Sequence, residues 1–372
     1  MKKAAIIMAV FVFFGVFGFA MASATTIGID LSHGESDKGL AVLTDKDGNV
    51  LAEGMIKTIS DVNWVYIGDP ALADTLGIQN IGDKITYDAL KDVDFLILGQ
   101  PSQAFSPDEI QAIVQWWNDG NRILWVAADS DYGDGPNRID FADTVLDAIG
   151  ANLRVDQASV EDATSNAGAG YRVIGLVNPD PDTPEKDMIT KDLANGGKVL
   201  FHGPGVVAYV DESGNWKPLP VGGGIENIYV IVTSSDDGQI VENTDPAANA
   251  YTAGDTGKFP LMAVQLFPDK KNVLIVSGET PYGGYEPMWA PEYKAYSLTG
   301  RSSSPTLLSG PSMSSRSSAK KPQPRLVKPA PRAERLAAPA VQLPWSASPL
   351  YRLSSTRGGS EFFSPFLCLL NH

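Results

Sequence analysis

The stretch from Phe95 to Asp131 constrains the fold of this chain more than any other part of the sequence. An apolar run of strand length, 95–99, is followed by Ser106-Pro-Asp-Glu109, the pattern of a helix N-terminus with a capping box and proline in the first turn. Apolar residues then recur at helical spacing until Gly120, and a second apolar run covers 123–127. This is a β-α-β unit, and its right-handed crossover requires the two strands to be parallel.

The rest of the body repeats the same alternation of strand and helix patterns. The residues 39–43 and 50–53 flank a turn-forming segment and predict an inserted β-hairpin, and 206–210 with 216–219 predict a second one. Further strands are expected at 26–30, 153–155, 171–176, 198–202, 228–233, 261–267 and 272–276. We therefore expect an α/β fold with a mainly parallel sheet flanked by helices.

The two ends of the chain differ from this body. Residues 1–24 contain two lysines, an apolar stretch and Ala22-Ser-Ala24, which predicts a secretory signal peptide cleaved after Ala24; a retained membrane anchor is the alternative. Residues 297–372 hold 16 Ser and 10 Pro with no periodicity, which predicts a disordered tail or stalk, or a segment that is not the natural end of the domain, such as an out-of-frame tail. The predicted α/β domain therefore spans 25–296.

Charge and cysteine content narrow the function classes. The whole chain carries a net charge of −15, whereas residues 297–372 hold ten Lys/Arg and two Asp/Glu, so the body is strongly acidic. An acidic body argues against a nucleic acid partner and against an anionic membrane surface, which leaves the signal segment or a missing anchor as the only expected membrane contact. The single cysteine, Cys368, excludes a disulfide framework and a cysteine nucleophile in the body.

Polar residues follow several of the predicted strands, at the edge where parallel sheets place their ligands. Four of them lie in Asp30-Leu-Ser-His-Gly-Glu35, where Asp30, His33 and Glu35 are suitable metal ligands and Ser32 with His33 could be a nucleophile and a base. The alternative is a polar loop whose side chains cap backbone groups. The other candidate ligand-binding residues at strand ends are Gln100, Ser102, His202 and Glu279.

Residues 129–140 form a second candidate site. Carboxylates at its positions 1, 3 and 12 resemble a calcium loop of the EF-hand type, although the sixth position is Asp rather than Gly. This predicts a calcium site with the ligands Asp129, Asp131, Asp134 and Asp140, and an ordinary turn capped by Asp side chains is the alternative.

Four segments together resemble a known fold family. They are Asp30-Leu-Ser-His-Gly-Glu35, 95–101, 106–113 and 121–126, and they are similar to the class I glutamine amidotransferase-like fold, in the non-catalytic branch of intraflagellar-transport head domains and of auxiliary proteins of gliding-type ABC transporters. The segment 196–205 resembles uncharacterised exported proteins of hyperthermophilic archaea. The resemblance implies an α/β domain without amidotransferase activity, because that activity needs a cysteine that this body lacks.

Three functions are compatible with these features. The first is an exported, non-catalytic domain that binds a ligand or a protein partner at the cell surface. The second is a metal-assisted hydrolase that uses Asp30, His33, Asp129 and His202. The third is a structural envelope component stabilised by calcium. The second requires the two histidines to converge on one site.

Overall fold

The structure is a computed structural model that describes residues 25–44, 49–60, 62–178, 197–282, 288, 292, 293 and 296–298. All of them lie in the first of two units, Met1–Thr306. The predicted signal peptide (1–24) and, apart from residues 297 and 298, the predicted tail (297–372) lie outside the described residues.

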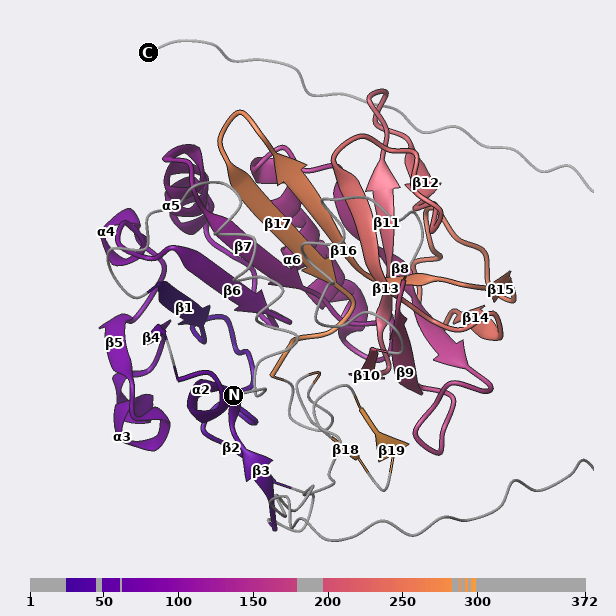
Figure 1. The fold of residues 1–372 in the computed structure, drawn as a ribbon. Helices are drawn as coiled ribbons and strands as arrows, with labels where there is room; N and C mark the ends of the chain where they lie inside the picture. The colour runs from indigo at the N-terminus through magenta and orange to yellow at the C-terminus, as the bar shows by residue number, and fades with distance from the viewer. Residues whose placement is uncertain are drawn as a thin grey trace, which may run out of the picture. The chain divides into compact units, whose positions relative to one another are not determined.

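A ten-stranded sheet forms the centre of the described unit (Figure 1). Its strand order is β10-β9-β13-β16-β17-β7-β6-β1-β4-β5. The strands are, from one edge to the other, Lys198–His202 (β10), Arg172–Val177 (β9), Ile228–Thr233 (β13), Pro260–Phe267 (β16), Asn272–Ser277 (β17), Ile123–Ala127 (β7), Phe95–Gly99 (β6), Thr26–Asp30 (β1), Asn63–Ile67 (β4) and Gln79–Gly82 (β5).

This sheet is mixed, so the prediction of a mainly parallel sheet is only partly right. The strands from β17 through β7, β6, β1 and β4 to β5 pair in parallel. The other pairs, from β17 to β10, are antiparallel. The change begins where β16 and β17 are joined by only four residues, 268–271, because so short a connection can join only antiparallel strands.

Helices and short turns connect the strands. They are Met55–Thr58 (α2), the 3₁₀ turn Pro70–Leu72 (η1), Ala73–Leu76 (α3), Tyr87–Leu90 (α4), Pro107–Asn118 (α5) and Gly135–Ala148 (α6). The predicted capping box is confirmed at α5: the Ser106 Oγ accepts from the Glu109 backbone N–H, and the Glu109 carboxylate accepts from the Ser106 N–H at 2.9 Å. Gly120, with a φ of 77°, turns the chain after this helix as expected.

Successive residues of the central strands supply two separate cores, because strand side chains alternate between the faces of a sheet. On one face, Leu96 and Leu124 pack in the same cluster as Trp116 and Trp117 of α5. On the other face, Ile97 and Trp125 belong to a cluster that includes residues of α2. Both faces of the parallel half are therefore buried, which holds the carboxyl ends of its strands rigidly at one edge.

A second sheet of five antiparallel strands packs beside the first. Its order is β12-β11-β8-β14-β15, with the strands Trp216–Pro218 (β12), Gly205–Val210 (β11), Leu153–Asp162 (β8), Gly238–Val241 (β14) and Thr256–Gly257 (β15). The pair β11 and β12 is the second predicted hairpin. Two small antiparallel pairs are Val42–Thr44 (β2) with Val50–Glu53 (β3), which is the first predicted hairpin, and Glu292–Tyr293 (β18) with Tyr296–Ser297 (β19).

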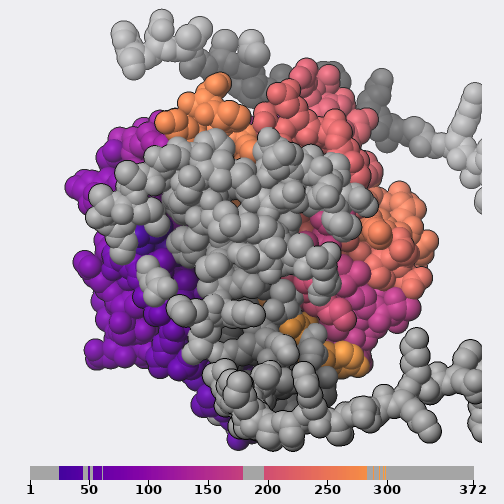
Figure 2. All heavy atoms as spheres, viewed as in Figure 1, coloured from indigo at the N-terminus to yellow at the C-terminus, as the bar shows by residue number. Residues whose placement is uncertain are grey.

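The strand order separates β17, the last strand of this sheet along the chain, from β1 by only two strands, β7 and β6. In the space-filling view, purple atoms occupy the left flank and pink atoms the right, while orange atoms lie both at the top and on the right (Figure 2). None of the described helices has both the length and the apolar composition needed to cross a membrane.

Candidate functional site

The loop that follows β1 folds back on the end of its own strand. Asp30 is fully buried, and its Oδ1 accepts hydrogen bonds from the Ser32 backbone N–H at 3.1 Å and from the Ser32 hydroxyl at 2.6 Å. Such a turn is typical of Asp before a loop, because the short side chain reaches the backbone two residues on. Gly34 continues the turn with a φ of 76°, in the left-handed region that favours glycine. The loop thus directs His33 back over the sheet edge.

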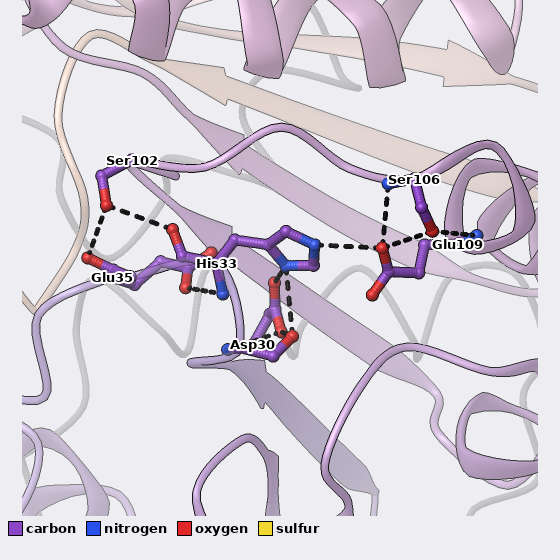
Figure 3. Close-up of polar contacts among 8 residues, drawn as sticks. Asp30, His33, Glu35, Ser102, Ser106 and Glu109 are labelled. Carbon is purple, nitrogen blue, oxygen red and sulfur yellow. Dashed lines mark hydrogen bonds and ion pairs between the residues drawn. The ribbon is translucent and has the colours of Figure 1, made fainter.

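The His33 ring lies between two carboxylates (Figure 3). Its Nδ1 is 2.7 Å from Oδ2 of Asp30, and its Nε2 is 3.4 Å from Oε2 of Glu109 in the first turn of α5. The ring of Phe105 covers it, with the two ring centroids 4.1 Å apart. We call Asp30, His33 and Glu109 the His33 bridge, since together they join the end of β1 to the start of α5.

The charges of the His33 bridge follow from these contacts. Burial by itself lowers the pKa of His33, but Asp30 and Glu109 outweigh burial, so the pKa lies above the ordinary value. For Glu109, burial by itself raises the pKa, because it disfavours the charged carboxylate. The hydrogen bonds from Ser106 and the nearby His33 outweigh burial, so the pKa of Glu109 lies below the ordinary value. An imidazolium held between carboxylates is the arrangement that both shifts favour.

This geometry does not support a serine–histidine relay. A base that activates a serine needs a free ring nitrogen facing the hydroxyl, with the orienting carboxylate on the other nitrogen. Here the Ser32 hydroxyl and Asp30 both lie on the Nδ1 side, at 3.1 Å and 2.7 Å, and Ser32 donates its proton to Asp30. Because Asp30 holds Nδ1 at the shorter distance and Nε2 faces Glu109, no free ring nitrogen faces the Ser32 hydroxyl.

Glu35 is the third acidic group of the site. Its Oε2 accepts the His33 backbone N–H at 2.8 Å. Burial, followed by the nearby Asp30 carboxylate, raises the pKa of Glu35 well above the usual range. Potential ligand atoms of Asp30, His33 and Glu35 all lie within 4.8 Å of one another, and this is the only such group of three within the part of the chain that the structure describes.

Ser102 and Gln100 belong to the edge of this site through their main chains. The Ser102 N–H donates to the His33 carbonyl at 2.8 Å, and its hydroxyl donates to the Gly34 carbonyl at 3.1 Å. Gln100 has a φ of 48°, unusual for a residue other than glycine, and Arg138 donates to its carbonyl at 3.0 Å. Both predicted residues therefore lie at the strand ends, and Ser102 fixes the loop that carries His33.

The four carboxylates of the predicted calcium loop do not converge. The loop interpretation of 129–140 is wrong from Gly135 onward, where α6 begins. Asp131 is fully buried and accepts hydrogen bonds from Ser159 and Asn243 at 2.7 and 2.9 Å, while Asp134 accepts from Asn137 and Asp140 from Gln157. Asp129 faces Arg138 at 3.7 Å. Each carboxylate thus has its own partner, in agreement with the alternative of a capped turn.

His202 and Glu279 form a separate polar group. The His202 backbone N–H donates to the Glu279 carboxylate, and the Tyr171 and His202 rings lie 5.3 Å apart between centroids. Burial raises the pKa of Glu279 well above the usual range, and Asp129 adds to the rise. Asp129 thus acts on Glu279, while Asp30, His33 and Glu35 contact one another at the end of β1.

Sequence reasoning missed two members of the site. Glu109 was assigned to the capping box alone, although the same carboxylate also faces His33. Tyr282, from the segment after β17, was not among the candidate residues, yet its side chain is fully buried beside the strand end at Gly99. No periodicity signals either contact, because both join segments that are far apart in the sequence.

A cavity of about 350 Å³ adjoins the Glu109 end of the His33 bridge. One wall is the segment 84–87 and the other is the first two turns of α5. Its lining residues include Lys84, Tyr87, Asp108 and Glu109. The volume is at the lower end of the range for small-molecule sites.

The comparisons with known proteins give little beyond these observations. No family model matches the chain, and no curated protein matches it. Among solved structures, the mmIFT52 N-terminal domain is similar to this chain with a TM-score of 0.40 and 13% sequence identity, over 68% of this chain and 85% of that one. A likeness at this level says nothing about which residues bind or react.

Proposed function

We propose that the chain is an exported, non-catalytic α/β domain that binds a ligand or a protein partner at the cell surface. Export rests on the signal-peptide pattern of residues 1–24, and a surface role suits the acidic body. The proposed relationship to the non-catalytic branch of the glutamine amidotransferase-like fold rests on the sequence segments quoted above.

One observation carries the non-catalytic part of the proposal. Both ring nitrogens of His33 face carboxylates, and Ser32, the neighbouring hydroxyl, donates to Asp30 instead of facing a free base. A histidine held in this way links two elements and does not exchange protons with a substrate. These contacts therefore favour a structural role for Ser32 and His33, the two residues that the sequence suggested as a nucleophile and a base.

The ligand-binding part of the proposal is supported by the cavity beside α5. Its two walls carry residues of opposite charge, Lys84 and Asp108, and the aromatic residue Tyr87. Such a lining suits a small polar ligand that carries both a donor and an acceptor. A ligand seated there would contact Glu109 and therefore the outer end of the His33 bridge.

The metal-assisted hydrolase is the weaker candidate. It requires Asp30, His33, Asp129 and His202 to act at one point, whereas Asp30 faces His33 and Asp129 faces Arg138. The calcium-stabilised envelope component is also a weaker candidate, because α6 begins at Gly135, inside the proposed ligand loop at 129–140.

Turnover of a substrate panel separates binding from hydrolysis. We expect the purified protein to show no hydrolysis of ester, glycoside and peptide libraries above that of a His33→Ala variant, because His33 has no nitrogen available as a base. The measurement is the initial rate for each library with both proteins. Turnover by the wild-type protein that disappears in His33→Ala would establish the hydrolase instead.

A further inference from the structure

The cavity beside α5 is bordered by one face of that helix. Asp108, Gln111 and Gln115 all line it. They lie at positions i, i+3 and i+7 of α5, a spacing that puts them on the same side of a helix. The opposite wall is the segment 84–87, which leads into α4. The cavity therefore lies between a polar stripe of α5 and this short segment.

Some polar groups of the lining are already used within the protein, and others are not. The hydroxyls of Thr86 and Ser106 cap α4 and α5, and the Glu109 carboxylate faces His33. Within the described part of the chain, the charged and amide side chains of the lining that have no hydrogen bond or ion pair are those of Lys84, Asp108, Gln111 and Gln115. All four residues are exposed, so they can pair with a ligand without first breaking a contact.

The charges of this set favour a ligand with one positive and one negative group. Lys84 is the only cation among the described lining residues, and Asp108 is the carboxylate without a partner. A ligand with two negative charges, such as a phosphomonoester, would meet the Asp108 and Glu109 carboxylates with a single cation to balance them. A ligand that carries one carboxylate and one cation avoids this repulsion.

The kind of cation follows from the same lining. A quaternary ammonium group is held best by a cage of aromatic rings, whereas the lining residues that the structure describes include one aromatic residue, Tyr87. An ammonium with N–H donors fits this wall better, because carboxylate and amide oxygens accept hydrogen bonds from it. Asp108 and the two glutamines of α5 supply such oxygens.

We propose that this cavity binds a small zwitterion of the free amino acid class, with the ligand carboxylate at Lys84 and the ligand ammonium at Asp108. Gln111 and Gln115 lie further along the same face of α5 and would bind the polar atoms of the ligand side chain. The volume of about 350 Å³ favours a single small molecule over an oligomer. This inference rests on the proposed ligand-binding function and specifies the ligand class.

Calorimetric titration of the purified protein with each of the standard L-amino acids in turn tests the ligand class. We expect saturable binding of at least one of them. Two analogues of that amino acid, the amine without the α-carboxylate and the acid without the α-ammonium, should each bind about tenfold more weakly, because each lacks one charge-assisted pair.

The result that would overturn this inference differs from the one that would overturn the proposed function. If no amino acid binds, the inference is wrong, and neutral monosaccharides titrated in the same assay then show whether the domain binds another small polar ligand. The proposed function fails instead through turnover of the ester, glycoside or peptide libraries.

Two variants locate the bound amino acid in the cavity. Lys84→Gln should weaken binding of the amino acid by about tenfold and leave its amine analogue unaffected, and Asp108→Asn should do the same with the acid analogue unaffected. Lys91→Gln and Asp88→Asn are the matched controls, since these exposed side chains pair with each other at 3.2 Å and neither residue lines the cavity. The inference is also wrong if Lys84→Gln and Asp108→Asn bind the amino acid as tightly as the two controls.

Discussion

Replacing His33 by alanine should lower the free energy of unfolding by about 3–5 kcal/mol, the cost typical of breaking a buried ion pair by removing one partner. The loss is large because the substitution leaves Asp30, which is fully buried, without the imidazolium that faces it at 2.7 Å. It also disconnects β1 from the first turn of α5. Urea unfolding with linear extrapolation gives the difference directly, and a loss of this size is a large share of the stability of a typical domain.

Two milder variants of the same site serve as controls. Ser32→Ala removes one hydroxyl bond to Asp30 and should cost about 1 kcal/mol. Glu109→Gln weakens the longer contact of the His33 bridge, 3.4 Å at a partly exposed carboxylate, and should cost less than His33→Ala. The account fails if His33→Ala costs no more than Ser32→Ala.

Asp131→Asn should lower the free energy of unfolding by about 2–4 kcal/mol, since hydrogen bonds to a buried charged group are stronger than neutral ones. Both Asp131 oxygens accept hydrogen bonds: Oδ1 from Ser159 and Asn243, and Oδ2 from the backbone of Asn243 and Thr244. In asparagine, one of the two oxygens is replaced by an amide NH₂, which cannot accept the hydrogen bonds that the donors on that side offer. Chemical denaturation of the wild-type protein and the variant measures the loss.

The same pair of proteins distinguishes a hydrogen-bonding role from a calcium-binding one. The difference between wild-type protein and Asp131→Asn should be equal with Ca²⁺ and with chelator, because Asp131 holds the segment at 243–244 and no cation. Asp134→Asn, an exposed neighbour bonded only to Asn137, is the matched control and should cost less than about 0.5 kcal/mol. A difference that disappears with chelator would show instead that Asp131 is a Ca²⁺ ligand.

The elements that follow from local signals were predicted well. The capping box and glycine stop of α5 and the apolar runs of β6 and β7 depend on neighbouring residues, and the structure confirms them. Residues 156–162 of β8 were missed because Asp156, Ser159 and Asp162 look like loop residues. They are buried because each anchors another segment; Asp156, for example, accepts the backbone N–H groups of residues 249–251.

The candidate site was predicted in part for the same reason. The loop after β1 was expected to hold polar residues at a strand end, and Asp30, His33 and Glu35 do lie together there. Glu109, the partner of His33, comes from a segment more than 70 residues further along the chain, and such a contact depends on the sheet order. The order was not predictable where the chain leaves the parallel half after β7, forms the antiparallel strands, and returns at β17 to pair with β7.

The protonation state of the His33 ring tests the central claim most directly. Nitrogen chemical shifts of the ring, measured by NMR from pH 5 to 9 with a chelator present, report whether each nitrogen carries a proton. Asp30 and Glu109 outweigh burial and raise the pKa of His33, so the account predicts that the ring is mainly in its doubly protonated form at pH 6.5 and that its titration midpoint lies above the ordinary pKa of histidine. A neutral ring at pH 6.5, with one nitrogen free to accept a proton, would contradict a structural His33 bridge and would restore His33 as a candidate base.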